Sequence, residues 1–124
     1  MPIVTIQCVG DDNRFEKAVV QRLADSLGEL FGSDPGTTWV RMNRLEDSDY
    51  AENLVDAAEG VRPTFVEVLK RSLSGENDLA IEARAVATCV AEELQRPVEN
   101  VHVIYLPEGA GRVAFGGDLI RRSQ

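Results

Sequence analysis

The sequence predicts an α+β fold made of α/β-type repeats, in which two βαβ units form a four-stranded sheet with two helices on one face. Three observations lead to this prediction. Each half of the chain has hydrophobic patterns in the order strand, helix, strand. Selected positions of the two halves correspond to each other at separations of 61–63 residues. Each helical segment is long enough to cross over between two parallel strands.

The first half is predicted to begin with a strand at residues 2–9, where apolar and polar side chains alternate. Residues 11–13 offer helix caps, and apolar side chains then recur at every fourth position, which places one helix face on the sheet. They are Phe15, Val19, Leu23, Leu27 and Phe31. A second strand is predicted over residues 38–45. Residues 46–61, which include 50–53, are predicted to be a loop or a short helix.

The second half repeats this order. A strand is predicted over residues 63–69, a turn and helix cap over 74–78, and a helix from there to Leu94. The strongest strand pattern of this half covers residues 101–106. In the closing stretch, Gly116 and Gly117 form a turn and not a phosphate loop, because neither a lysine nor a helix start follows them.

The repeat itself sets the domain organisation. Pro2 corresponds to Pro63 at a separation of 61 residues, and the second strands of the two halves match at the same separation. We therefore expect one domain, residues 1–124, with pseudo-repeats at 2–61 and 62–124. Because both helices cover one sheet face, the other face, which carries Thr5 and Gln7, is expected to be covered by another subunit.

The composition excludes several functions. Thirteen basic and 21 acidic residues give a net charge of −8, which repels nucleic acids and anionic membranes. No apolar stretch approaches the roughly 18 residues of a membrane span, and no secretion signal opens the chain, so a cytoplasmic protein is expected. Cys8 and Cys89 lie in apolar runs as small hydrophobic residues, and His102 is the only histidine, so neither metal nor cofactor is expected.

The chain opens on Met1-Pro2, and an initiator methionine is usually removed before a small residue. A free α-amino group titrates at roughly 7.7–8.0, near working pH, whereas a lysine starts near about 10.4. Burial and nearby cations lower the pKa of such an amine further. Pro2 is therefore a candidate general base. Many ordinary proteins also begin with this pair, so the remaining sequence must support the assignment.

The paired units, with Pro2 directly after Met1, resemble the tautomerase superfamily. In particular, they are similar to the 4-oxalocrotonate tautomerase-like members in which two short units are joined in one chain. The resemblance covers nearly the whole sequence. It is clearest in the second half, where Pro97, residues 101–103 (Val-His-Val) and residues 115–117 (Phe-Gly-Gly) follow the pattern of the short members.

The resemblance implies a proline base in a pocket with arginines that bind substrate carboxylates and an aromatic residue on its wall. The base falls on Pro2 alone, since the nitrogen of Pro63 is an amide. The second-strand arginine falls on Arg41, and the aromatic residue falls on Tyr50.

The second half departs from the family pattern. It has His102 in place of the arginine and Val113 in place of the aromatic residue. The arginine that follows the first strand has no counterpart in the first half, but Lys70 and Arg71 lie about two residues from the matching place in the second. A pocket shared between the two halves, and between neighbouring subunits of a homotrimer, is implied.

The activity implied is a keto–enol tautomerase that acts on small 2-hydroxy-dienoate or 2-oxo acids and therefore has a small carboxylate as its partner. Relatives also hydrate or dehalogenate haloacrylates or decarboxylate a semialdehyde, and these reactions stay open. So does a non-catalytic, ferredoxin-like module that binds small molecules, in which Met1-Pro2 is incidental.

Overall fold

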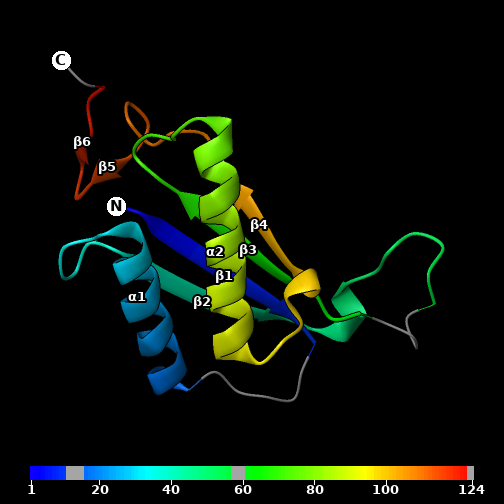
Figure 1. Ribbon diagram of the computed structural model, residues 1–124. Helices are drawn as coiled ribbons and strands as arrows, with labels where there is room; N and C mark the ends of the chain where they lie inside the picture. The colour runs from blue at the N-terminus through cyan, green and yellow to red at the C-terminus, as the bar shows by residue number, and fades with distance from the viewer. Residues whose placement is uncertain (11–15, 57–60, 123–124) are drawn as a thin grey trace.

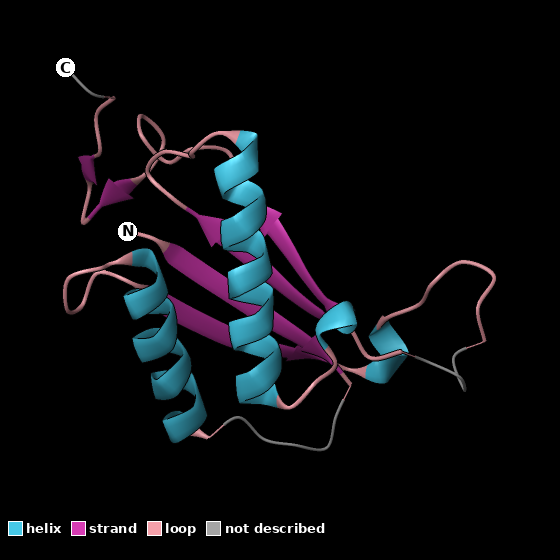
Figure 2. Ribbon diagram, viewed as in Figure 1, coloured by secondary structure: helices cyan, strands magenta, loops and turns pink. Residues whose placement is uncertain are grey.

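A computed structural model of the chain describes residues 1–10, 16–56 and 61–122 (Figure 1). Its centre is a mixed sheet of four strands in the order β2-β1-β3-β4. These strands are β1 (Ile3–Val9), β2 (Trp39–Leu45), β3 (Thr64–Leu69) and β4 (Val101–Tyr105). Two helices, α1 (Lys17–Phe31) and α2 (Glu76–Leu94), lie side by side on one face of the sheet (Figure 2). The predicted fold class is confirmed.

The pairing of the strands follows the repeat. β1 is parallel to β2 and β3 is parallel to β4, whereas β1 and β3 are antiparallel neighbours. In a split βαβ arrangement of the ferredoxin-like kind, the two strands of a unit are not direct neighbours. Here they are, so the fold is not ferredoxin-like.

The core lies between the sheet and the helices. Val4, Ile6 and Cys8 of β1 alternate toward the helices and are fully buried, because successive side chains of a strand point to opposite faces. They pack in one cluster with Leu23 and Leu27 of α1. Burying each such aliphatic side chain contributes about 1.5–3 kcal/mol to folding. This packing explains why apolar side chains recur at every fourth position along α1.

Several boundaries differ from those predicted. α2 begins at Glu76, within the stretch expected to be a turn, because Glu76 and Asp78 occupy its first turn, where acidic side chains are favourable. The segment after β2, expected to be a loop or a short helix, contains a 3₁₀ turn, η1 (Asp47–Asp49), which ends just before residues 50–53. The glycine turn at 116–117 joins two short strands, β5 (Ala114–Phe115) and β6 (Asp118–Leu119), which were not predicted. The cap expected at residues 11–13 and Phe15 lie outside the described residues.

The antiparallel pairing of β1 and β3 separates the starts of the two repeats. Ile3 pairs with Leu69, so the start of β1 and the end of β3 share one end of the sheet, which we call the Pro2 end. Cys8 pairs with Thr64 at the opposite end, where Pro63 lies, and we call this the Pro63 end. The two prolines that match in sequence are thus at opposite ends of the molecule.

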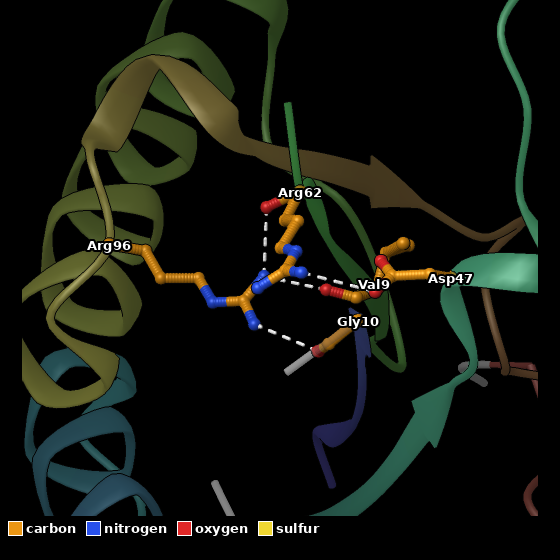
Figure 3. Close-up of polar contacts among 5 residues, drawn as sticks. All are labelled: Val9, Gly10, Asp47, Arg62 and Arg96. Atoms are coloured by element: carbon orange, nitrogen blue, oxygen red, sulfur yellow. Dashed lines mark hydrogen bonds and ion pairs between the residues drawn. The ribbon is translucent and has the colours of Figure 1, made fainter. Parts of the chain in front are cut away.

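The Pro63 end is closed by the guanidinium group of Arg96, which follows α2 (Figure 3). Its Nη1 donates to the carbonyl oxygens of Arg62 at 2.8 Å and Val9 at 3.2 Å, and its Nη2 donates to that of Gly10 at 3.3 Å. Arg62 also forms an ion pair of 3.1 Å with Asp47. The backbone carbonyl groups of Val9, Gly10 and Arg62 at the Pro63 end therefore have hydrogen-bond donors within the chain. The contacts at this end are structural.

The sheet face opposite the helices carries polar side chains at alternate positions. Thr5 and Gln7 are half-buried there, and Arg41 and Glu67 are exposed. None of the described helices covers this face (Figure 1). Within the described ranges, no helix is long and apolar enough to cross a membrane.

Candidate functional site

Pro2 lies at the start of a central strand and is buried. Its carbonyl oxygen accepts a hydrogen bond of 3.1 Å from the backbone N–H of Trp39, at the start of β2. Since the next residue pairs with Leu69, residues 70 and 71 follow at the same end of the sheet. Pro2 is thus fixed between the start of one strand and the end of another.

The side chain of Met1 fills a niche beside Pro2. Its Cε lies only 2.6 Å from where a Cβ at Gly109 would stand, and Val113 and the carbonyl oxygen of Lys70 lie 3.2 and 3.4 Å from that point. We call this space, bounded by Gly109 and Val113, the Met1 niche. Only glycine at position 109 leaves room for a side chain of this length.

Lys70 is held on the helix side of the Pro2 end. Its Nζ lies 2.8 Å from Oε1 of Glu82 and 5.4 Å from the centre of the Phe31 ring. The hydroxyl of Tyr105 donates to the other oxygen of Glu82 at 2.9 Å. Burial, and then the hydrogen bond to Glu82, raise the pKa of Tyr105 well above its usual range. Lys70 is therefore part of an ordered polar cluster.

Arg71 lines a cavity of about 520 Å³ at the same end of the molecule. Two further arginines, Arg112 and Arg122, line it with Glu108. We call it the arginine cavity. One nitrogen of Arg71 donates to the carbonyl oxygen of Arg121 at 3.1 Å, which orients the guanidinium group. Of the predicted site residues, Lys70 and Arg71 thus share one end of the sheet with Pro2.

Arg41 lies on the open face of the sheet. Its Nη2 donates to Oγ1 of Thr5 at 2.9 Å, and its side chain is exposed. Arg41 pairs with Thr5, whereas Trp39 pairs with Ile3 at the start of β1, so Arg41 lies further from the Pro2 end than Trp39 does. Within one chain, Arg41 is therefore separate from the arginine cavity.

Tyr50 follows η1 and lies at the Pro63 end. Its hydroxyl donates to Oε2 of Glu52 at 2.6 Å, and its ring centre is 6.1 Å from that of Phe65. The hydrogen bond to Glu52 is the main reason that the pKa of Tyr50 is raised, with burial and the charge of Glu52 adding to it. Within one chain, Tyr50 and Pro2 occupy opposite ends of the sheet.

Trp39 and His102 each have a defined ring contact. Trp39 is 49% exposed, and its ring meets the edge of Phe115 at a centre distance of 5.2 Å. It therefore attaches the β5–β6 hairpin to the sheet. His102, which stands in place of the family arginine in the second half, is exposed, and its ring lies 5.8 Å from that of Phe65.

Sequence reasoning missed Arg112, Arg122, Glu108 and Gly109. These residues lie after the last strand of the main sheet, where no periodic pattern marks their direction. A usable signal was the local concentration of basic residues in an acidic chain, since Arg112, Arg121 and Arg122 fall within the last thirteen positions. Their meeting with Arg71 depends on long-range hydrogen bonds that local patterns do not encode.

Comparison with protein-family models and with curated proteins finds no match. Solved structures do share the fold. A fused 4-OT, described as a symmetric trimer, has a TM-score of 0.74 at 13% identity over 95% of this chain and 94% of its own. Pt0534, inactivated by 2-oxo-3-pentynoate, has a TM-score of 0.72 at 16% identity over 95% of both chains.

A third similar structure is the FG41 malonate semialdehyde decarboxylase inhibited by 3-bromopropiolate. Its TM-score is 0.67 at 14% identity, over 94% of this chain and 92% of its own. These proteins define the class of fold: two βαβ units joined in one chain, as in the tautomerase superfamily. At 13–16% identity, the likeness is one of fold.

Proposed function

We propose that the protein is a tautomerase in which removal of Met1 frees the secondary amine of Pro2 to act as general base. The observation that carries this proposal is the position of Pro2: buried, at the start of a central strand, with Arg71 at the same end of the sheet. The shared fold with fused 4-OT supports it. The proposed substrates are small 2-hydroxy-dienoate or 2-oxo acids.

In the proposed reaction, neutral Pro2 takes a proton from the substrate hydroxyl, or from the carbon beside its carbonyl. It returns that proton further along the conjugated system, so the protein leaves the cycle unchanged. Arg71 binds the carboxylate and stabilises negative charge on the 2-oxo oxygen. Proton transfer by a positioned base contributes roughly 10²- to 10⁴-fold to the rate. Lys70 lies next to the ring of Phe31 and is held by Glu82 at the same end of the sheet.

The loss of Met1 has a second effect in this proposal. Its side chain occupies the niche bounded by Gly109 and Val113, so its removal opens a space that leads to the new amine. An unbranched chain of similar length fits that space. The proposed substrate therefore places its carboxylate toward Arg71 and its hydrocarbon chain in the Met1 niche.

We further propose that the protein is a homotrimer with pockets shared between subunits. Arg41 is on the uncovered sheet face and Tyr50 is at the Pro63 end, so each reaches a Pro2 pocket only from another copy. The structural neighbour fused 4-OT is described as a trimer. Native mass spectrometry at micromolar concentration tests this assembly, and a monomer there contradicts the shared pocket.

The first experiment on the base is the intact mass of the purified chain, because a retained Met1 removes the proposed base. The second is turnover of phenylenolpyruvate and 2-hydroxymuconate by the wild type, Pro2→Ala and the loop control Pro35→Ala, which changes an exposed proline. Pro2→Ala is expected to lower kcat/KM by at least about 10²-fold. A loss of only a few-fold contradicts the assignment of Pro2.

A covalent probe checks the same amine independently. Because Pt0534 is inactivated by 2-oxo-3-pentynoate, we expect this compound to label Pro2. Peptide mapping after incubation identifies the modified residue. Labelling elsewhere, with Pro2 untouched, argues against a reactive amine.

A decarboxylase is the second candidate, favoured by the fold shared with a malonate semialdehyde decarboxylase. The same pocket would then use protonated Pro2 to withdraw electrons from the substrate carbonyl. Release of carbon dioxide from malonate semialdehyde, compared with tautomerase turnover on the same preparation, separates the two activities.

A further inference from the structure

We infer that Glu82 of α2 is a positioning residue for the site at Pro2. It binds residues at the ends of β3 and β4 at the same time, and so fixes the backbone beside the Met1 niche. The inference rests on the proposed function, because the substrate chain is proposed to lie in this niche. It gives a role to a side chain on a helix, where the sequence analysis placed no site residue.

The two oxygens of the Glu82 carboxylate have separate partners. Oε1 lies 2.8 Å from Nζ of Lys70, the residue directly after β3, and Oε2 accepts a hydrogen bond of 2.9 Å from the hydroxyl of Tyr105, the last residue of β4. The backbone joins the same strand ends, since the N–H of Leu106 donates to the carbonyl oxygen of Val68 at 3.0 Å. One carboxylate thus ties α2 to both strand ends.

Lys70 connects this carboxylate to the Met1 niche. Its side chain is held by Glu82, and its carbonyl oxygen accepts a hydrogen bond of 2.8 Å from the N–H of Gly109. The same carbonyl oxygen lies 3.4 Å from where a Cβ at Gly109 would stand, and Cε of Met1 lies 2.6 Å from that point. A displacement of Lys70 would therefore shift Gly109, which bounds the niche.

The surroundings of the Lys70–Glu82 pair restrict its movement. The two side chains are only 23% and 19% exposed, and Nζ of Lys70 lies 5.4 Å from the centre of the Phe31 ring of α1. The attraction between opposite charges is stronger at such partly buried positions than in water, and the aromatic ring adds a favourable contact for the cation. The pair is therefore held between two helices and the end of a strand.

An ion pair at this place does more for orientation than for stability. Taking two charges out of water carries a large desolvation cost, and an apolar pair of similar volume is often at least as stable. An apolar pair, however, imposes no direction. A carboxylate whose two donors lie on different strands does impose one, because hydrogen bonds weaken steeply when they are misaligned. Stability and orientation can therefore be measured apart from each other.

Amide hydrogen exchange of the purified chain tests the positioning without any turnover. Glu82→Gln removes the charge that binds Lys70 and keeps an oxygen that can accept from Tyr105. We expect the amide of Gly109 to exchange at least about tenfold faster in this variant than in the wild type, because its acceptor is no longer held from the helix. Thermal melting checks that the variant is folded. Glu82→Asp, which keeps the charge on a side chain one methylene shorter, is the second variant if it is not.

The matched control is Glu93→Gln, the same change on the same helix. Glu93 also forms an ion pair, with Nε of Arg22 at 3.0 Å, but it lies near the other end of α2. Equal exchange of Gly109 in the two variants overturns the inference. The amide of Gly10, which donates to the carbonyl oxygen of Leu45 at the Pro63 end, reports on the rest of the chain. Equal acceleration at Gly10 and Gly109 would indicate general destabilisation and also overturns it.

A double variant separates positioning from stability. Lys70→Met combined with Glu82→Gln leaves neither charge without its partner, so urea unfolding should recover most of the stability that Lys70→Met alone loses. Turnover of phenylenolpyruvate should nevertheless stay at least about tenfold below that of the wild type in kcat/KM, mainly through a higher KM, because the niche is no longer held in shape. Recovery of kcat/KM together with stability overturns the inference.

Exchange and turnover together distinguish this inference from the proposed function. If the wild type turns over neither substrate but exchange at Gly109 is accelerated in Glu82→Gln, the positioning is supported and the proposed reaction is not. If turnover depends on Pro2 but exchange at Gly109 is unchanged in Glu82→Gln, the proposed reaction stands and the role of Glu82 is overturned.

Discussion

Lys70 and Glu82 form an ion pair, with Nζ and Oε1 2.8 Å apart, at the end of the sheet where Pro2 begins the chain's central strand. Both side chains are largely shielded, with 23% and 19% of their surface exposed. The lysine that the family resemblance assigns to the substrate is thus bound within the protein. The neighbouring Arg71 lines the cavity and is better placed for a carboxylate.

This relationship predicts a structural role for Lys70. Lys70→Met removes the cation that pairs with Glu82 and leaves the hydroxyl of Tyr105 as the hydrogen-bond donor to that carboxylate, so the free energy of unfolding should fall by about 1–3 kcal/mol. Urea unfolding measures it. Lys17→Met, at an exposed position of α1, is the control. Equal losses for the two variants would show that the ion pair contributes nothing.

Arg96 should be a principal stabilising residue of the Pro63 end. Arg96→Met removes the guanidinium group that donates hydrogen bonds to the carbonyl groups of Val9, Gly10 and Arg62. We expect a loss of about 2–4 kcal/mol in the free energy of unfolding, because hydrogen bonds from a charged group are the stronger kind. Arg84→Met is the matched exposed control. A loss below that of the control would exclude Arg96 as a stabilising residue.

Gly10 should tolerate no side chain. Its φ is +60°, and an added Cβ would meet Oδ1 of Asp47 and approach Nε of Arg62 to 2.9 Å. Gly36 has a similar φ, +78°, but open space around it. Gly36→Ala should cost about 1–2 kcal/mol from backbone strain alone, and Gly10→Ala clearly more. Chemical denaturation compares them, and equal costs would mean that the Asp47–Arg62 pair moves aside freely.

Gly109 should determine the size of the substrate chain. With Met1 removed, Gly109→Ala keeps contacts of 3.2 Å to Val113 and 3.4 Å to the carbonyl oxygen of Lys70, so folding is expected but the niche is narrower. We expect KM to rise about tenfold for a phenyl-bearing substrate and less for a short linear one. Steady-state kinetics on both substrates measures the ratio. An unchanged ratio would place the substrate chain elsewhere.

The thiol of Cys89 should react slowly with alkylating reagents. Burial, and then the charges of Glu93 and Glu92, raise its pKa above the ordinary value. Iodoacetamide at pH 8 should therefore modify Cys89 more slowly than free cysteine, and fully buried Cys8 only after unfolding. Peptide mass spectrometry over time distinguishes the two sites. A rate for Cys89 equal to that of free cysteine would contradict the shift.

The same shift gives a pH dependence of stability. In the folded chain the neutral thiol of Cys89 is favoured. Its contribution to the free energy of unfolding is therefore fully present below the thiol pKa of the unfolded chain, about 8.5. Above it, the unfolded chain loses the proton first and the free energy of unfolding falls. Cys89→Ala should remove this part of the decline between pH 8 and pH 10. Parallel curves of the free energy of unfolding against pH for the wild type and Cys89→Ala would show that Cys89 does not contribute to the decline.

The sequence was sufficient for the topology of each unit because burial has a different period in strands and helices. The alternation of Val4, Ile6 and Cys8, and the four-residue spacing of Leu23 and Leu27, correspond to the buried positions observed. The order of the four strands lay beyond these patterns, since pairing of β1 with β3 joins the two repeats across the whole chain. Local periodicity carries no information about that partner.

The candidate site was predictable only in part. The family resemblance picked out Pro2 and Arg71, but they share one end of the sheet because β1 and β3 pair in antiparallel fashion, a register that the repeat does not reveal. Arg112 reaches the same cavity through the hydrogen bond between Gly109 and Lys70, which no motif signals. Arg41 and Tyr50 lie away from Pro2 within one chain, and local sequence patterns do not encode the proposed sharing of pockets between copies.

The hydrogen bonds of Arg96 at the Pro63 end limit whether a circular permutation of the chain can create a second active amine. A circular permutant that begins at Pro63 would give this proline a free secondary amine, chemically equal to that of Pro2. Its nitrogen would emerge among carbonyl groups already bound to a guanidinium group, with the Arg62–Asp47 pair beside it. A new amine at the Pro63 end would lie beside carbonyl groups that Arg96 already binds, so we expect the duplicated architecture to support one base per chain and not two.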